Sequence, residues 1–130
     1  MATAPTRPAL RERYDRRQEA VVRQAAKVFA KRGYDQTTMQ ELAATMGLAT
    51  GALYHYFGAK EQLLTAVCDQ LMEPLLAQSR ELAERELPPR QQLRMLVRRW
   101  VGDVVVPRDH TLVFPQGRHM IGTREQWSGV

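Results

Sequence analysis

The chain of 130 residues has a single cysteine and no long apolar run. Because one thiol cannot form an intramolecular disulfide, a disulfide-stabilised secreted fold is excluded, and we expect Cys68 to pack in a core. A helix that crosses a bilayer needs about 18 consecutive apolar residues, and no stretch approaches that length. The first ten residues also lack the apolar stretch of a signal peptide. These absences favour a cytoplasmic protein without membrane contact.

The sequence patterns of common enzyme classes are also missing. The chain has no nucleophile elbow, no glycine-rich phosphate loop and no carboxylate pair suited to acid–base catalysis. His110 and His119 lack cysteine or carboxylate partners at metal-ligand spacing, so we expect no metal site and no cofactor. The sequence therefore argues against an enzyme.

Acidic residues are scarce in the first half of the chain only. Residues 1–60 carry ten Lys or Arg against five Asp or Glu, whereas residues 61–130 carry nine of each. The whole net charge of +5 therefore lies in the N-terminal half. Such a one-sided basic field attracts a polyanion, most commonly nucleic acid. The alternative is a soluble protein of modest charge with no such partner.

Helical periodicity dominates the remaining sequence and predicts an all-α fold without strands. Residues 1–14 combine prolines, small residues and arginines without periodicity, which is typical of a mobile basic arm. A first helix is expected from Asp15, where Gln18 gives capping-box-like spacing, to Gly33 as its C-terminal stop.

Two short helices are expected next, joined by a glycine. Thr38 and Glu41 have capping-box spacing ahead of a two-turn apolar stripe that ends at Gly47. A third helix is expected from Leu48 to Tyr56. Two short helices around a glycine-containing turn are typical of a helix-turn-helix, here residues 38–57.

Longer helices are expected in the second half. One begins at Lys60, and Pro74 should kink or end it because proline lacks an amide donor, although residues 76–86 can continue it. Another follows Pro88 and ends at Pro107. Residues 108–130 support only a weak prediction of a sixth helix.

The order of these signals resembles the TetR (tetracycline repressor) family of regulators over residues 15–75. The resemblance is carried by residues 33–34, 37–38, 41–43, 47–57 (GLATGALYHYF) and 60–64 (KEQLL), in the family's order and spacing. It implies an N-terminal three-helix helix-turn-helix domain that binds DNA. It also implies a helical dimerisation and ligand-binding domain, of which residues 76–130 would supply a partial or shortened version, because family members are usually longer.

The resemblance further implies which residues contact double-stranded DNA. In a helix-turn-helix, the second helix lies in the major groove and presents its N-terminal half to the bases. The residues expected at DNA are Thr38, Ala49, Thr50, Gly51, Ala52, Tyr54, His55 and Lys60.

Each of these residues has a physical reason for its expected role. Thr38 would direct the start of its helix at a phosphate, or else be a cap with no DNA role. The small residues 49–52 allow close approach to the bases. Tyr54 and His55 can each donate one hydrogen bond to a phosphate oxygen, and Lys60 would hold another phosphate unless it is merely solvated. The arginines of residues 7–17 either add DNA contacts or form a solvated tail.

Two positions depart from the family pattern, because Ala49 and Ala59 stand where the family often has serine. An N-cap oxygen typically contributes about 1 kcal/mol, so either the helices begin less firmly or Thr50 and Gly58 provide the caps. The missing hydroxyl at Ala49 also makes phosphate contacts better supported than any particular base contact.

The second half offers candidates for binding a small, mostly apolar effector: Trp100, Val104 and Phe114. An apolar stripe at helical spacing is more often plain core, and that alternative stays open. Arg98 and Arg99 could meet an anionic effector, or could form a solvated face.

The resemblance therefore implies a transcriptional regulator, a ligand-relieved repressor that binds a near-palindromic operator as a homodimer. The alternative is a helical protein-interaction adaptor that has lost DNA binding.

Overall fold

The computed structural model describes residues 7–105 and 109–117, and in those ranges every regular element is a helix. The order is α1 (Pro8–Arg32), α2 (Met39–Thr45), α3 (Thr50–Tyr56), α4 (Lys60–Ala83), α5 (Pro89–Val105), α6 (Asp109–Val113) and the short 3-10 helix η1 (Phe114–Gly117). The predicted all-α fold is confirmed.

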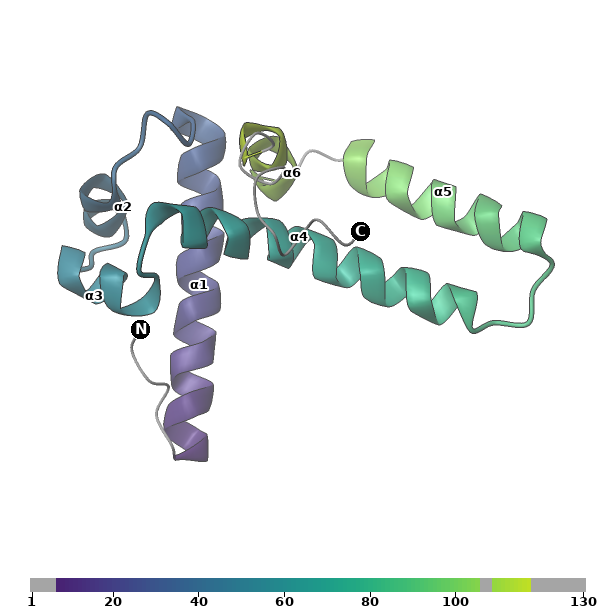
Figure 1. Ribbon diagram of the computed structural model, residues 1–130, viewed down its shortest axis with the longest axis horizontal. Coiled ribbons are helices and arrows are strands. Elements are labelled where there is room, and N and C mark those ends of the chain that lie inside the picture. Colours follow the sequence, from purple (N-terminus) through teal and green to yellow (C-terminus); the bar gives the residue numbers. More distant parts are fainter. Residues whose placement is uncertain (1–6, 106–108, 118–130) are drawn as a thin grey trace.

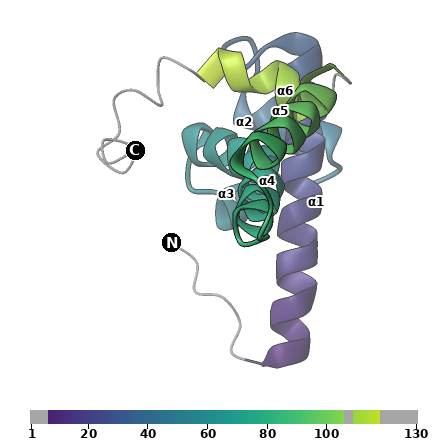
Figure 2. The same ribbon diagram turned by 90° about the vertical axis from the view of Figure 1, so that its right-hand side faces the viewer.

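Helix α1 forms an upright axis, and α4 crosses it at a steep angle (Figure 1). Helices α2 and α3 lie on one side of α1, while α4 and α5 form a long antiparallel hairpin that extends to the other side (Figure 1). Helix α6 returns to pack against α1 and α4. The N-terminal half of α1 projects beyond all the other helices (Figure 2).

A single core joins α1, α2, α3, the first half of α4 and α6. Its fully buried large side chains include Phe29, Leu42, Leu53, Leu63 and Val67. Cys68 is buried in this core, as predicted, and its desolvation raises the pKa of the thiol to about 11. Val113 of α6 is also fully buried there, so a late segment of the chain completes the N-terminal domain.

The first helix begins earlier than the sequence predicted. It starts at Pro8 instead of Asp15, so the expectation of a mobile arm is wrong for residues 8–14. Proline is well suited to the first turn of a helix, where its missing amide hydrogen has no intrahelical partner. The remainder of the predicted arm, residues 1–6, lies outside the described residues.

The boundaries of two other helices also differ from expectation. Pro74 does not end α4, which runs unbroken to Ala83 and crosses the domain boundary expected at residue 75. Helix α3 begins at Thr50, two residues later than predicted, because residues 46–49 form the turn. The structure gives the sixth helix only five residues, Asp109–Val113.

Candidate nucleic-acid interface

The predicted helix-turn-helix is formed by α2, the turn at residues 46–49 and α3. Gly47 has φ 65°, a left-handed conformation that residues with a β-carbon adopt at a cost. The Leu48 amide donates to the Ala43 carbonyl at 2.8 Å and closes the turn. This turn sets the direction in which α3 leaves α2.

The start of α2 is held by the predicted capping box. The Thr38 amide donates to Glu41 Oε2 at 2.8 Å, and the Glu41 amide donates to Thr38 Oγ1 at 3.2 Å. The hydrogen bonds from the Thr38 backbone and then from its hydroxyl lower the pKa of the Glu41 carboxyl. Thr38 is exposed, so the cap is confirmed and its hydroxyl still lies at the surface.

Helix α3 begins without a side-chain cap. Its N-cap is Ala49, and only backbone bonds from the Ala52 and Leu53 amides to the Ala49 carbonyl close the first turn. Ala59 likewise caps α4 without a side-chain bond, but Gln62 Oε1 accepts from the Gly58 amide at 3.0 Å. The N-cap residues are therefore Ala49 and Ala59, and neither Thr50 nor Gly58 takes over the N-cap position.

Most of α3 faces outward. Leu53 alone among its seven residues is fully buried, and Phe57 follows it into the core. Gly51, Tyr54 and His55 are exposed, and Tyr54 is 48% exposed despite its large ring. The N-terminal turn of α3 thus presents a narrow surface of small residues, flanked at its C-terminal end by two side chains with polar donors.

An aromatic cluster ties this outward face to α1. The ring of Tyr14 lies 5.0 Å from that of Tyr56 and 6.3 Å from that of His55, in the latter case edge-on. Such ring pairs contribute about 0.5–1.5 kcal/mol beyond their burial. Sequence reasoning missed Tyr14 because it was assigned to the arm. The available signal was its spacing, one heptad before Val21 on the same helical face.

Lys60 is half-buried and forms hydrogen bonds with the backbone of the protein. Its ammonium group donates to the carbonyls of Tyr34 at 2.9 Å and Thr37 at 3.1 Å, and it lies 4.1 Å from the centroid of the Tyr34 ring. It therefore fixes the turn between α1 and α2. The alternative of a merely solvated lysine is wrong.

A second long-range contact fixes the same turn. Gln116 of η1 accepts from the Tyr34 amide at 2.7 Å and donates to the Phe29 carbonyl at 3.3 Å. No sequence pattern marked this residue, because its partners lie more than 80 positions away.

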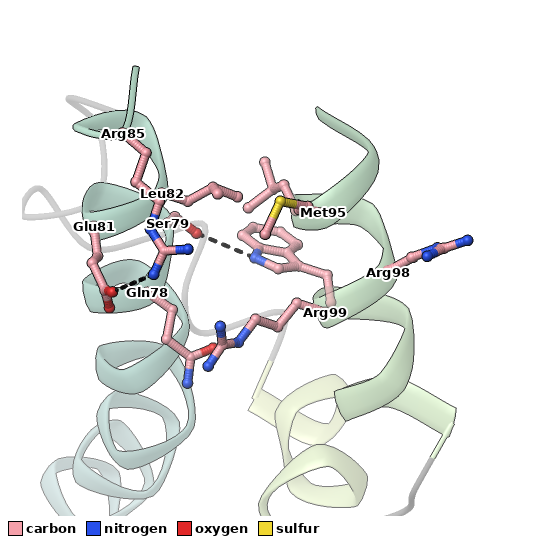
Figure 3. A pocket seen from close by; sticks show the side chains of 10 residues that line it. Gln78, Ser79, Glu81, Leu82, Arg85, Met95, Arg98 and Arg99 are labelled. Atoms are coloured by element: carbon pink, nitrogen blue, oxygen red, sulfur yellow. Dashed lines mark hydrogen bonds and ion pairs between the residues drawn. The ribbon is translucent and has the colours of Figure 1, made fainter. Parts of the chain in front are cut away.

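The second half of the chain contains a cavity of about 300 Å³ between α4 and α5. Trp100 lines it, and its indole N–H donates to Ser79 Oγ at 3.3 Å (Figure 3). Arg99 extends from α5 toward Gln78, whereas the Arg98 side chain extends from α5 in the opposite direction (Figure 3). The Oε1 atom of Gln78 is buried without a hydrogen-bond partner.

The three predicted effector residues do not come together in this cavity. Phe114 packs instead against the N-terminal core, and the side chain of Val104 lies outside the described residues. The cavity wall mixes apolar side chains with charged ones: Gln78, Ser79, Glu81, Leu82, Arg85, Met95, Leu96, Arg98, Arg99 and Trp100.

Within residues 7–105 and 109–117 no cluster of three or more His, Cys, Asp or Glu side chains could hold a metal ion. In the same ranges, no helix combines the length and apolar character that crossing a membrane requires.

Comparison with known proteins agrees with this geometry. The family model TetR_N, described as bacterial regulatory proteins of the tetR family, matches residues 21–67. The HTH-type transcriptional repressor KstR2 of Rhodococcus jostii is 34% identical over 73 residues, which are 56% of this chain and 36% of the repressor. The HTH-type transcriptional regulator BetI of Rhizobium meliloti is 34% identical over 82 residues, which are 63% of this chain and 40% of that protein.

Solved structures extend the likeness beyond the matched region. The ketosteroid transcriptional regulator KstR2 of Mycobacterium tuberculosis superposes with a TM-score of 0.75 at 22% identity, over 87% of this chain and 58% of that one. The TetR-family transcriptional regulator PfmR from Thermus thermophilus gives a TM-score of 0.65 at 29% identity, over 77% and 54%. The chain spans less than half the length of the curated relatives that it matches. Residues 21–67, which include the helix-turn-helix, thus match the TetR family of bacterial regulatory proteins, and the relatives of this region are named transcriptional repressors and regulators.

Proposed function

We propose that the chain is a transcriptional regulator that binds double-stranded DNA in a sequence-specific manner through α2 and α3. The observation that carries this is the outward face of α3: a seven-residue helix that buries one residue fully and presents small residues at its N-terminal turn. An α-helix fits the major groove, and small side chains let its backbone approach the base edges. TetR-family regulators are generally non-enzymatic transcription factors, which favours this function over catalysis.

The predicted contacts divide into two groups. Ala49, Thr50, Gly51 and Ala52 would face the bases, with Thr50 offering a hydroxyl and a methyl group. Tyr54 and His55 would donate hydrogen bonds to phosphate oxygens, which position the protein without reading sequence. Because few strong base donors lie on α3, we expect the phosphate contacts to supply most of the affinity.

Thr38 and Lys60 would contribute in a different way. Both already hold internal hydrogen bonds, Thr38 with Glu41 and Lys60 with the turn before α2. Lys60 has three ammonium protons and donates to two carbonyls, so one further donor is left for a phosphate. Substituting either residue should change folding as well as DNA affinity.

The regulatory part of the proposal is a ligand-relieved repressor, a homodimer on a near-palindromic operator. Two recognition helices about 34–36 Å apart would enter successive major grooves. An effector that binds one dimer geometry better than the other would shift the population away from the DNA-binding state. Its site would adjoin Trp100 in the cavity between α4 and α5, where Arg99 favours an effector with an anionic group. Such a repressor would act in the bacterial cytoplasm, where the chromosome is.

Fluorescence anisotropy with a palindromic promoter duplex and a random duplex of equal length tests the DNA-binding proposal. We expect tighter binding to the palindrome and a steep loss of affinity with added salt. Tyr54→Phe, which removes only the hydroxyl, should weaken binding by about tenfold or more, because a hydrogen bond to a charged group contributes about 1.5–3 kcal/mol. Gln91→Ala, at an exposed position on α5, is the control and should bind as the wild type does.

Equal, salt-insensitive binding to both duplexes would refute the proposal and favour the interaction-adaptor alternative. Unchanged affinity in both Tyr54→Phe and His55→Ala would refute the assigned contacts while leaving the function intact.

A further inference from the structure

The N-terminal half of α1 is a basic helix attached directly to the proposed DNA-reading helix. Five arginines lie at positions 7, 11, 13, 16 and 17, against two acidic residues, Glu12 and Asp15. All seven of these residues are exposed. Glu12 forms an ion pair with Arg16 at 3.5 Å, so the charges of these two residues cancel. The rest of the segment keeps an excess of positive charge.

The ring contacts of Tyr14 identify the side of this helix that faces α3. Its ring packs against those of His55 and Tyr56, at the C-terminal end of α3. Residues separated by three, four or seven positions share one face of a helix. Arg11 precedes Tyr14 by three positions, so it lies on the face that meets α3, and Arg7, the N-cap residue of α1, precedes Tyr14 by seven positions at the end of the same face. Arg13 and Arg16 are one and two positions away from Tyr14 and point elsewhere.

The spacing of Arg7 and Arg11 along the helix is compatible with the spacing of phosphates along a DNA strand. At about 1.5 Å per residue, Arg7 lies about 10 Å beyond Tyr14 along the axis, and about 6 Å separate Arg7 from Arg11. Each DNA strand offers one phosphate per about 3.4 Å of its axis, so the two guanidinium groups can meet different phosphates. Among the helices of the described residues, this segment projects past all the others (Figure 2).

We propose that Arg7 and Arg11 form a phosphate-binding extension of the DNA interface, which contacts the duplex outside the stretch read by α3. This inference rests on the proposed DNA binding. In it, Tyr14 is a positioning residue: it docks the basic helix onto α3 so that both meet the same duplex. Because phosphates carry no base identity, the extension adds affinity equally on any sequence.

The test measures the slope of log affinity against log salt on a random duplex. Each phosphate contact contributes about −0.9 to this slope. Arg7→Ala/Arg11→Ala should therefore make the slope shallower by about 1.8 for each protomer bound. The matched control, Arg13→Ala/Arg16→Ala, removes the same charge from the other faces of the helix and should leave the slope nearly unchanged. Circular dichroism checks that both doubles keep the helical content of the wild type, which alanine favours.

A second measurement locates the contact. On a palindromic promoter duplex, trimming the flanking base pairs should abolish the difference between wild type and Arg7→Ala/Arg11→Ala, because the phosphates that these arginines bind are then absent. Tyr14→Ala, which keeps every charge, should also make the slope shallower.

Equal slopes for the two double variants would overturn the inference, since net charge and not one helical face would then be responsible. A difference that survives trimming of the flanks would overturn it too. The proposed function fails separately, if the wild type does not prefer the palindromic over the random duplex.

Discussion

Replacing Lys60 with methionine separates its internal role from its expected role at DNA. The substitution keeps the apolar stem and removes two charge-assisted hydrogen bonds and one contact with an aromatic ring. Hydrogen bonds to charged groups contribute about 1.5–3 kcal/mol each, and an exposed cation–π contact about 0.5–1. Because Lys60 is only half-buried, water replaces part of these interactions, and we expect a loss near 2 kcal/mol.

Urea unfolding followed by circular dichroism measures this loss. With a slope of about 2 kcal/mol per molar urea, the midpoint should fall by about 1 M. Lys27→Met is the matched control, because Lys27 is an exposed lysine of α1 at a distance from this turn, and its midpoint should stay within about 0.25 M of the wild type, as is usual for surface substitutions. If Lys60→Met has the same midpoint as the control but binds DNA more weakly, the hydrogen bonds and ring contact of Lys60 do not stabilise the fold. That result would refute the internal role of Lys60.

Three further predictions concern the helix-turn-helix. Leu53→Ala should cost about 2–5 kcal/mol in the same unfolding assay, because this is the one fully buried side chain of α3; a cost under about 1 kcal/mol would contradict the packing described. Ala49→Ser should stabilise the protein by about 0.5–1 kcal/mol by supplying the missing N-cap oxygen, seen as a melting temperature a few degrees higher, and a lower melting temperature would speak against it. The pKa of Glu41 is lowered in the folded state, so its carboxylate contributes stability that is present above the unfolded pKa of about 4.3 and disappears as the pH falls through the folded value. The stability advantage of the wild type over Glu41→Gln should therefore shrink below about pH 4, and a constant difference from pH 7 to pH 3 would exclude this linkage.

Local signals predicted the helix-turn-helix well because its elements are specified by neighbouring residues. The capping box of Thr38 and Glu41 and the left-handed turn at Gly47 both act within four positions of the chain. The proline at position 8 was interpreted as part of an arm, yet it stands where a helix best tolerates it. Pro74 was expected to kink or end α4, and of the two alternatives the helix continues past it to Ala83.

The sequence by itself determined the all-α class, the helix-turn-helix and the residues exposed on α3, since helical periodicity, caps and small residues are properties of short segments. Only the tertiary structure decided what long-range packing controls. It brought Tyr14 to His55 and Tyr56, placed Lys60 across the turn after α1, and returned Gln116 and Val113 to the N-terminal core. These contacts join residues up to 87 positions apart, and no local pattern encodes which partners meet once the core is packed.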